Sequence, residues 1–460
     1  MKSLFPSSFL FTVSLSFIIA KANSMSESLL SEFPQGVSDA IQYERSLWAH
    51  SAEEDAAFYS VSGIDMASAQ PGTPIKVQED ANVPQNYTLP PNTAVSRFIY
   101  VSESLSGERR PVSGYVLWPY MPRLDANGGN QVVAWAHGTS GTTVSTAPSK
   151  FKNLWNHFIA PYQLVLQGYV VVATDYAGLG VGKDQNNHSI AHDFFASSSV
   201  ATDVVYSVQA AKKAFPQLSE SFVVLGHSQG GGATWGVAQK HAVSKIPGYL
   251  GAIAISPATS VLDNPEPFGS LIAATMAPGI AALYPEFDYN DFFTPDGLEL
   301  FQKIVKLDCA SSTTIPILLT LAGNLLKPDW TSNEWLLKYD NLTANGGRKI
   351  SGPLLVIQGD NDPMVNYNNT VKKLGAALDL SPTSHVQLFR LPGTSHTPAV
   401  TGSQRIWMDW IADRFAGVQL QSFDKNASFT SVVTPARNLS SYVPELNWFV
   451  GPATEPYQTP

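Results

Sequence analysis

Short apolar runs rich in β-branched residues recur along the chain, and stretches with helical spacing separate several of them. The runs lie at residues 131–137, 169–174, 222–226, 250–256, 354–358 and 386–391. Between them, residues 198–214 repeat apolar side chains three or four positions apart. Strands that are apolar throughout are typical of a parallel sheet that helices cover on both faces. The sequence therefore predicts an α/β fold with a mostly parallel central sheet.

This alternation of strand and helix breaks once, between residues 257 and 352. The stretch is too long for one crossover helix, and its apolar blocks are interrupted by prolines. We therefore expect an inserted helical cap over the strand ends. The rest divides into a core at 23–256 and 353–416, which includes a lead-in at 23–93, and a C-terminal tail at 417–460 that packs on the core.

The first 22 residues have the pattern of a secretory signal peptide. Lys2 precedes a short apolar stretch, and Ala20-Lys21-Ala22 forms a small-residue cleavage site. The stretch is too short to span a bilayer, which favours cleavage over a membrane anchor. Six N-x-[ST] sequons suit a secreted glycoprotein, at Asn86, Asn187, Asn341, Asn368, Asn426 and Asn438. We expect a secreted, extracellular protein without stable membrane insertion, and transient contact with a lipid interface stays open.

Composition excludes several other classes of protein. The 460-residue chain has a formal net charge of −9 and no basic patch beside its aromatic residues, which argues against a nucleic-acid partner. It has no H-E-x-x-H motif and no glycine-rich nucleotide motif. With one cysteine, Cys309, it forms no internal disulfide. We therefore expect no metal and no cofactor.

A serine among glycines follows one of the predicted strands. Gly226-His227-Ser228-Gln229-Gly230 fits G-x-S-x-G, a pattern that also occurs by chance in a chain rich in glycine and serine. Here the motif lies between a strand and a helical stretch, where a nucleophile elbow requires it. The alternative is an ordinary strand–helix turn. We predict that Ser228 is a nucleophile.

A serine nucleophile needs a histidine base and an acid that orients the base, and in this arrangement the chain order is serine, acid, histidine. Asp360 and Asp362 follow the strand at 354–358, and His396 follows the strand at 386–391. Asp362 is preferred as the acid because it lies deeper in its loop, whereas Asp360 is placed to cap the turn. The predicted catalytic residues are Ser228, Asp362 and His396.

The remaining histidines and acids near strand ends receive structural roles. The His227 side chain is expected to point away from the site, and His192 to lie in a loop apart from the strand ends. Asp175 is an alternative acid, but we expect it to tie down loops beneath the nucleophile. For the oxyanion, preorganised backbone N–H groups are required. The predicted donors are Gln229, directly after the nucleophile, and Thr139 in the glycine-containing loop that His137 anchors.

Together these stretches resemble the fungal secretory lipases, a branch of the α/β-hydrolases. The resemblance rests on AWAHGTSG (134–141), GYVVVATDYAGLG (168–180), GHSQGG (226–231), QGDNDPMV (358–365) and the loop around His396. It implies an α/β-hydrolase fold with a helical cap and an activity on lipid or other carboxyl esters. Members of this family commonly have a cysteine bonded to the cap where this chain has Thr146, so the resemblance implies that Cys309 is an unpaired partner and that the cap is tethered less firmly.

The predicted function is a secreted serine carboxylester hydrolase, a lipase or esterase, acting on a small-molecule or lipid ester. Two other hydrolases stay open: a narrow esterase for an acylated secondary metabolite, and an exopeptidase. The exopeptidase would need an acidic cluster in the cap, for which Glu286, Asp288 and Asp291 are available. From another class, a catalytically silent binding protein also stays open.

Overall fold

The computed structural model describes residues 29–66, 68–82, 85–155, 159–264, 266–311, 314–315, 318, 324–420 and 430–442. The predicted signal peptide and the sequon at Asn426 lie outside these residues.

A ten-stranded mixed sheet forms the centre of the described chain, in the order β1-β2-β3-β5-β4-β6-β7-β8-β9-β10. The pairs β1–β2, β2–β3 and β3–β5 are antiparallel. All later neighbours in this order, from β5–β4 to β9–β10, are parallel. The strands are β1 (Pro74–Gln78), β2 (Thr93–Glu103), β3 (Arg109–Pro119), β4 (Asn130–Ala136), β5 (Val170–Thr174), β6 (Leu218–His227), β7 (Tyr249–Ile255), β8 (Leu354–Gly359), β9 (Val386–Leu391) and β10 (Thr430–Val432). The predicted parallel sheet is therefore confirmed.

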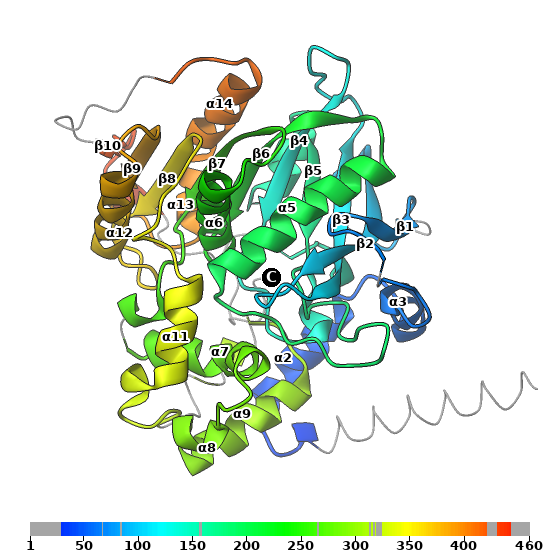
Figure 1. The fold of residues 1–460 in the computed structure, drawn as a ribbon, viewed down its shortest axis with the longest axis vertical. Coiled ribbons are helices and arrows are strands. Elements are labelled where there is room, and N and C mark those ends of the chain that lie inside the picture. Colours follow the sequence, from blue (N-terminus) through cyan, green and yellow to red (C-terminus); the bar gives the residue numbers. More distant parts are fainter. Residues whose placement is uncertain are drawn as a thin grey trace, which may run out of the picture.

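Helices cover both faces of this sheet, which explains why its strands are apolar throughout (Figure 1). Alternate strand residues enter two separate cores: Val224 packs with the first group of helices and Leu225 with the second. The first group is α5 (Ser197–Ala214), α6 (Gln229–Val243) and α12 (Tyr367–Leu380); the second is α4 (Pro161–Leu166), α13 (Pro398–Gly402) and α14 (Gln404–Phe415).

The stretch predicted as a cap holds four described helices between β7 and β8, gathered at one end of the sheet (Figure 1). They are α7 (Phe268–Leu283), α8 (Tyr289–Phe292), α9 (Pro295–Leu307) and α11 (Glu334–Thr343). These helices share their own apolar cluster, which includes Met276, Phe292 and Leu336. The cap thus has a core distinct from the two that flank the sheet.

The lead-in is part of the folded body and contributes to both cap and core. It contains the short helices α2 (Gln35–Ser46) and α3 (Ala52–Tyr59) and the edge strand β1. No strand was predicted in this lead-in. Helix α2 lies beside α9 (Figure 1), where Ile41 packs with Leu307 and Cys309. Arg97, a buried residue of β2, binds helix α3 to the sheet, because its guanidinium donates to Asp55 at 3.2 Å.

The described part of the C-terminal tail reaches the opposite edge of the sheet. Strand β10 pairs in parallel with β9, with Thr430 opposite Leu388. A three-residue strand with mostly exposed side chains carries little apolar patterning, which explains why the sequence predicted only a packed tail.

Candidate active site

Ser228 occupies a sharp turn between β6 and α6. Its φ of 58° and ψ of −120° fall in a region that non-glycine residues rarely adopt. The turn is fixed because the Ser228 N–H donates to the Ile255 carbonyl at 3.0 Å and the Ser228 carbonyl accepts from Ala258 N–H at 3.1 Å. A Cβ at Gly230 would collide with the Ala136 carbonyl, so the glycine lets α6 approach β4. This is the geometry of a nucleophile elbow.

His396 and Asp362 lie together at the same edge of the sheet, each in the loop after its strand. His396 Nδ1 and Asp362 Oδ2 are 2.8 Å apart, and the Asp362 side chain is fully buried. The other carboxylate oxygen accepts the N–H groups of Met364 and Val365, each at 2.9 Å. Burial by itself would raise the pKa of Asp362, but His396 and these N–H groups outweigh it and hold the pKa below its usual value. Asp362 therefore stays ionised beside the imidazole.

The other edge of the His396 imidazole, which carries Nε2, lies at the cavity beside Ser228. His396 Nε2 is buried and has no hydrogen-bond partner among the described residues, and both His396 and Ser228 line the same cavity. A neutral imidazole that donates its Nδ1 proton to a carboxylate has a lone pair on Nε2. The arrangement leaves one ring nitrogen available to accept a proton in the cavity.

The competing acids have other partners. Asp360 forms an ion pair with Arg390 at 2.7 Å and accepts the Gly393 N–H at 2.6 Å, so it holds the loop after β9. Asp175, directly after β5, accepts hydrogen bonds from Ser113 at 2.7 Å and from Ser149, in the loop after β4, at 2.5 Å. The expectation that Asp175 ties down loops is therefore confirmed.

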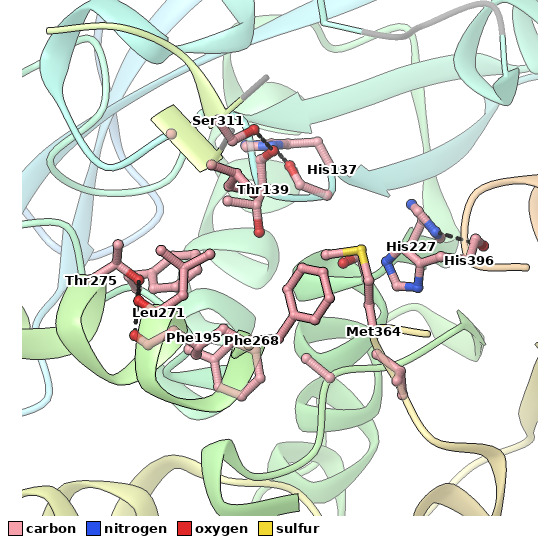
Figure 2. Close-up of a pocket in the computed structure, with 18 of the residues that line it drawn as sticks. His137, Thr139, Phe195, His227, Phe268, Leu271, Thr275, Ser311, Met364 and His396 are labelled. Atoms are coloured by element: carbon pink, nitrogen blue, oxygen red, sulfur yellow. Dashed lines mark hydrogen bonds between the residues drawn. The ribbon is translucent and has the colours of Figure 1, made fainter. Parts of the chain in front are cut away.

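Both predicted oxyanion donors lie where the elbow and a second loop converge. Gln229 is the first residue of α6, and the first N–H groups of a helix have no acceptor within it. Thr139 belongs to the loop after β4 and lines the cavity with Gly138 (Figure 2). His137 anchors this loop as expected: its ring stacks on Tyr176 with centroids 4.0 Å apart, and its Nδ1 lies 2.7 Å from the Gly138 carbonyl.

The prediction that the His227 side chain points away from the site is wrong. Its ring lies 4.6 Å from the His396 ring, and its Nε2 is 3.2 Å from the His396 carbonyl oxygen. The elbow reverses the chain directly after His227, which leaves this last strand residue facing the loop after β9 (Figure 2). Ser256 Oγ, from the end of β7, also donates to the His396 carbonyl at 3.3 Å. Two strand ends thus fix the backbone of His396.

His192 was also predicted to lie apart from the strand ends, and the structure corrects this. Its Nε2 lies 3.0 Å from Nε2 of Gln229, and its Nδ1 lies 2.9 Å from the Ala177 carbonyl. Burial lowers the pKa of His192 to about 4. Burial likewise lowers the pKa values of His137 and His227 to about 3. These three rings are neutral at pH 7 and surround the elbow without adding charge.

A cavity of about 480 Å³ extends from Ser228 under the cap. Its cap side carries apolar side chains such as Ile272 and, labelled in Figure 2, Phe268 and Leu271 of α7, together with the uncharged polar residues Asn264, Thr275, Ser311 and Thr314. None of its described lining residues is Asp, Glu, Lys or Arg. A concave apolar site with a few convergent polar groups is typical of a small-molecule site.

The described part of the chain offers no group of three His, Cys, Asp or Glu side chains arranged to hold a metal ion. Nor does any helix in the described ranges combine the length and hydrophobicity needed to cross a membrane.

Of the sequon asparagines, Asn187, Asn341, Asn368 and Asn438 are exposed. Asn86 is half-buried, and its amide Nδ2 lies 3.1 Å from His50 Nδ1.

Solved structures with a similar fold include several hydrolases. Candida antarctica lipase A in its closed state aligns with a TM-score of 0.63 at 15% identity, over 81% of this chain and 88% of that chain. A putative hydrolase from Legionella pneumophila gives 0.59 at 17% identity, over 76% and 98%. The rice cell wall degrading esterase LipA from Xanthomonas oryzae gives 0.55 at 18% identity, over 76% and 97%. At such identities the likeness establishes the α/β-hydrolase fold.

A search of the curated proteins gives no match. The sequence does match a family profile, Hydrolase_4, described as serine aminopeptidase, S33, over residues 156–399. The matched region is more than half of the chain and runs from the segment before α4 to α13, which includes Ser228, Asp362 and His396. With its fold and this match, the chain belongs to the Hydrolase_4 family of α/β-hydrolases.

Proposed function

We propose that the protein is a secreted serine carboxylester hydrolase, of the lipase or esterase kind, for esters with an uncharged, apolar acyl group. The observation that carries this proposal is the environment of Ser228. An elbow serine and a histidine paired with a buried aspartate open into one cavity whose described lining carries no Asp, Glu, Lys or Arg. Such a cavity accepts an apolar ester without leaving a buried charge unpaired.

In the proposed reaction, His396 Nε2 takes the proton of Ser228 Oγ as that oxygen attacks the ester carbonyl carbon. The N–H groups of Thr139 and Gln229 stabilise the oxyanion of the tetrahedral intermediate. Asp362 stays ionised, orients the imidazole and stabilises its protonated form. The alcohol leaves with the proton from His396, and water then attacks the acyl-serine with His396 again as base, which releases the acid.

The family description favours one second candidate, an aminopeptidase. Such an enzyme must bind the α-ammonium group of its substrate near the nucleophile, and a buried ammonium requires an acidic partner. The acidic cap residues Glu286, Asp288 and Asp291 do not line the cavity. Asp288 instead caps α8 by accepting the Asn290 N–H at 2.8 Å. The ester hydrolase is therefore the better-supported proposal.

The two candidates separate in one substrate panel. Purified protein is assayed with p-nitrophenyl esters from acetate to palmitate and with aminoacyl p-nitroanilides. We expect hydrolysis of the esters only, and a loss of at least about 10⁵-fold in kcat for Ser228→Ala. Ser244→Ala, an exposed serine at the other end of α6, is the matched control and should behave as wild type. Faster cleavage of the anilides than of the esters would replace the proposal with the aminopeptidase.

Secretion and glycosylation are proposed on sequence grounds, from the N-terminal pattern of residues 1–22 and the sequons. The four exposed asparagines are accessible to a glycan, whereas Asn86 would first have to release its contact with His50. Glycosidase treatment and N-terminal sequencing of the protein from a culture medium test both points.

A further inference from the structure

The segment that follows α9, residues 308–311, lies between the lead-in helix α2 and the loop that carries Thr139. We call this segment the strap. Cys309, Ala310 and Ser311 are all buried. Cys309 packs with Ile41 of α2, and Ala310 packs with Phe151 and Trp155. The strap is thus fixed on two sides by parts of the chain that are more than 150 residues away in sequence.

Ser311 bonds two consecutive peptide groups of the Thr139 loop. Its hydroxyl donates to the Thr139 carbonyl at 2.7 Å, and its backbone N–H donates to the Ser140 carbonyl at 2.8 Å. Figure 2 shows the Ser311 side chain beside Thr139, and both residues line the cavity. A residue of the cap region therefore holds the backbone of a loop that extends from the sheet.

These bonds decide where the loop's N–H groups point. In a trans peptide, C=O and N–H point in opposite directions, so fixing a carbonyl also fixes the N–H of the next residue. His137 Nδ1, facing the Gly138 carbonyl at 2.7 Å, sets the Thr139 N–H from the core side. Ser311 sets the next two peptide groups from the cap side. The peptide group that carries the Thr139 N–H is therefore set by His137 of the core, and the two peptide groups that follow it are set by Ser311 of the strap.

The strap is itself anchored by two carboxylates. Asp308 accepts hydrogen bonds from the Ser145 N–H at 3.1 Å and the Ser145 hydroxyl at 2.5 Å. Glu44 of α2, which is buried, accepts the Ala310 N–H at 2.8 and 2.9 Å with its two oxygens. Ser145 precedes Thr146, and Asp308 precedes Cys309. Charge-assisted hydrogen bonds therefore join cap and core next to Thr146 and Cys309, the two positions where the family resemblance implied that a disulfide is missing.

We propose that Ser311 is a positioning residue that holds the Thr139 loop in its oxyanion-binding conformation, with the strap anchored by Glu44 and Asp308. The proposal rests on the proposed ester hydrolase function, and it places part of the catalytic preorganisation in the cap and lead-in. Because the oxyanion forms only in the transition state, weakening the strap should lower kcat and leave KM nearly unchanged.

The decisive variants are Ser311→Ala, which removes the bond to the Thr139 carbonyl, and Ser311→Thr, which keeps a hydroxyl. Deleting an oxyanion donor outright costs about 10²- to 10³-fold in kcat, so misplacing one should cost about 10-fold. With p-nitrophenyl butyrate at 25 °C, we expect this loss for Ser311→Ala, a KM within about twofold of wild type, and recovery of most of kcat in Ser311→Thr.

Thr294→Ala is the control for general weakening of the cap. Thr294 caps α9, with its hydroxyl accepting the Gly297 N–H at 3.1 Å, and the same hydroxyl donates to the Asn324 carbonyl at 2.6 Å, within the cap. We expect kcat of this variant to match wild type. If Ser311→Ala does not fold, Asp308→Asn serves instead, because it weakens the charge-assisted bonds to Ser145 and should lower kcat by about threefold.

Two kinds of failure are distinguishable. If wild-type protein hydrolyses no ester, the proposed function is wrong and the role of the strap falls with it. If wild type is active but Ser311→Ala, or Asp308→Asn in its place, keeps wild-type kcat, or loses no more than Thr294→Ala does, the strap does not position the oxyanion loop and the ester hydrolase proposal stands.

Discussion

The two sides of the cavity differ in what they are made of. The sheet side carries the polar groups: Ser228, His396 and Asp362 on strand-end loops, with neutral histidines around them. The cap side, to which α7 contributes four residues, is mainly apolar, and its polar side chains, Asn264, Thr275, Ser311 and Thr314, donate to backbone carbonyls. Under the proposed function, the sheet side supplies the reacting groups and the apolar side chains of the cap side select the substrate, whereas Ser311 acts on the reaction through the Thr139 loop. Changing each side should therefore alter a different kinetic quantity.

The largest effect is expected on the sheet side, where the loop after β8 carries two aspartates with different partners. Asp362→Asn removes the carboxylate that faces His396 Nδ1 at 2.8 Å and should lower kcat by about 10⁴-fold. Asp360→Asn, two residues away, weakens an ion pair with Arg390 outside the cavity and should leave kcat within about threefold of wild type. Equal losses in the two variants would mean that the loop matters as a whole and that Asp362 has no separate role.

The neutral histidines of the sheet side predict a dependence of stability on pH. His192 has a folded pKa of about 4, and its pKa in the unfolded chain is about 6.5. Between these values the unfolded chain binds the extra proton, so the free energy of unfolding falls as the pH falls from 6.5 toward 4, by up to about 1.4 kcal/mol per pH unit.

His192→Asn removes this contribution while keeping a donor to the Ala177 carbonyl. Denaturant unfolding at several pH values between 4.5 and 6.5 should show a shallower slope for the variant, by about one proton. Buried carboxylates with raised pKa values, such as Asp175, oppose the slope equally in both proteins and so cancel in the difference. Identical slopes would show that His192 is not held neutral by the fold.

The smallest of these effects tests the cap side. Phe268 is the first residue of α7, and its ring lines the cavity (Figure 2). Phe268→Ala should lower kcat/KM for long-chain esters by about 10-fold, through lost apolar contact, and change acetate hydrolysis little. Leu283→Ala, at the other end of α7 and outside the cavity, is the matched control. A loss shared equally by acetate and long-chain esters would assign Phe268 to the reaction instead.

The sheet side could be predicted from sequence because its residues obey a topological rule. Parallel strands end at one edge of a sheet, so Ser228, Asp362 and His396 could be placed together from their positions after apolar runs. The structure brings Asp362 and His396 into contact and places Ser228 on the same cavity. The packing of His227 against His396 was missed, because the direction of a side chain at a sharp turn depends on backbone angles that no local pattern specifies.

The individual contacts of the cap side could not be predicted from the sequence. Ser311 and Thr139 are 172 residues apart, and neither belongs to a motif that names the other. Helix α2 likewise contacts the strap through Glu44, which belongs to none of the motifs found in the sequence. Such contacts follow from how the cap and lead-in pack together, and their side chains carry no periodic signal of that packing.

The central claim, that Ser228 is the nucleophile, is tested most directly by covalent labelling. The folded protein is incubated with a fluorophosphonate ester and digested, and the modified peptide is located by mass spectrometry. We predict one phosphonyl group on Ser228, formed at least about 10³-fold more slowly in His396→Ala because the base is missing. A folded, ester-hydrolysing protein that carries the label on another residue, or none at all, would contradict the account.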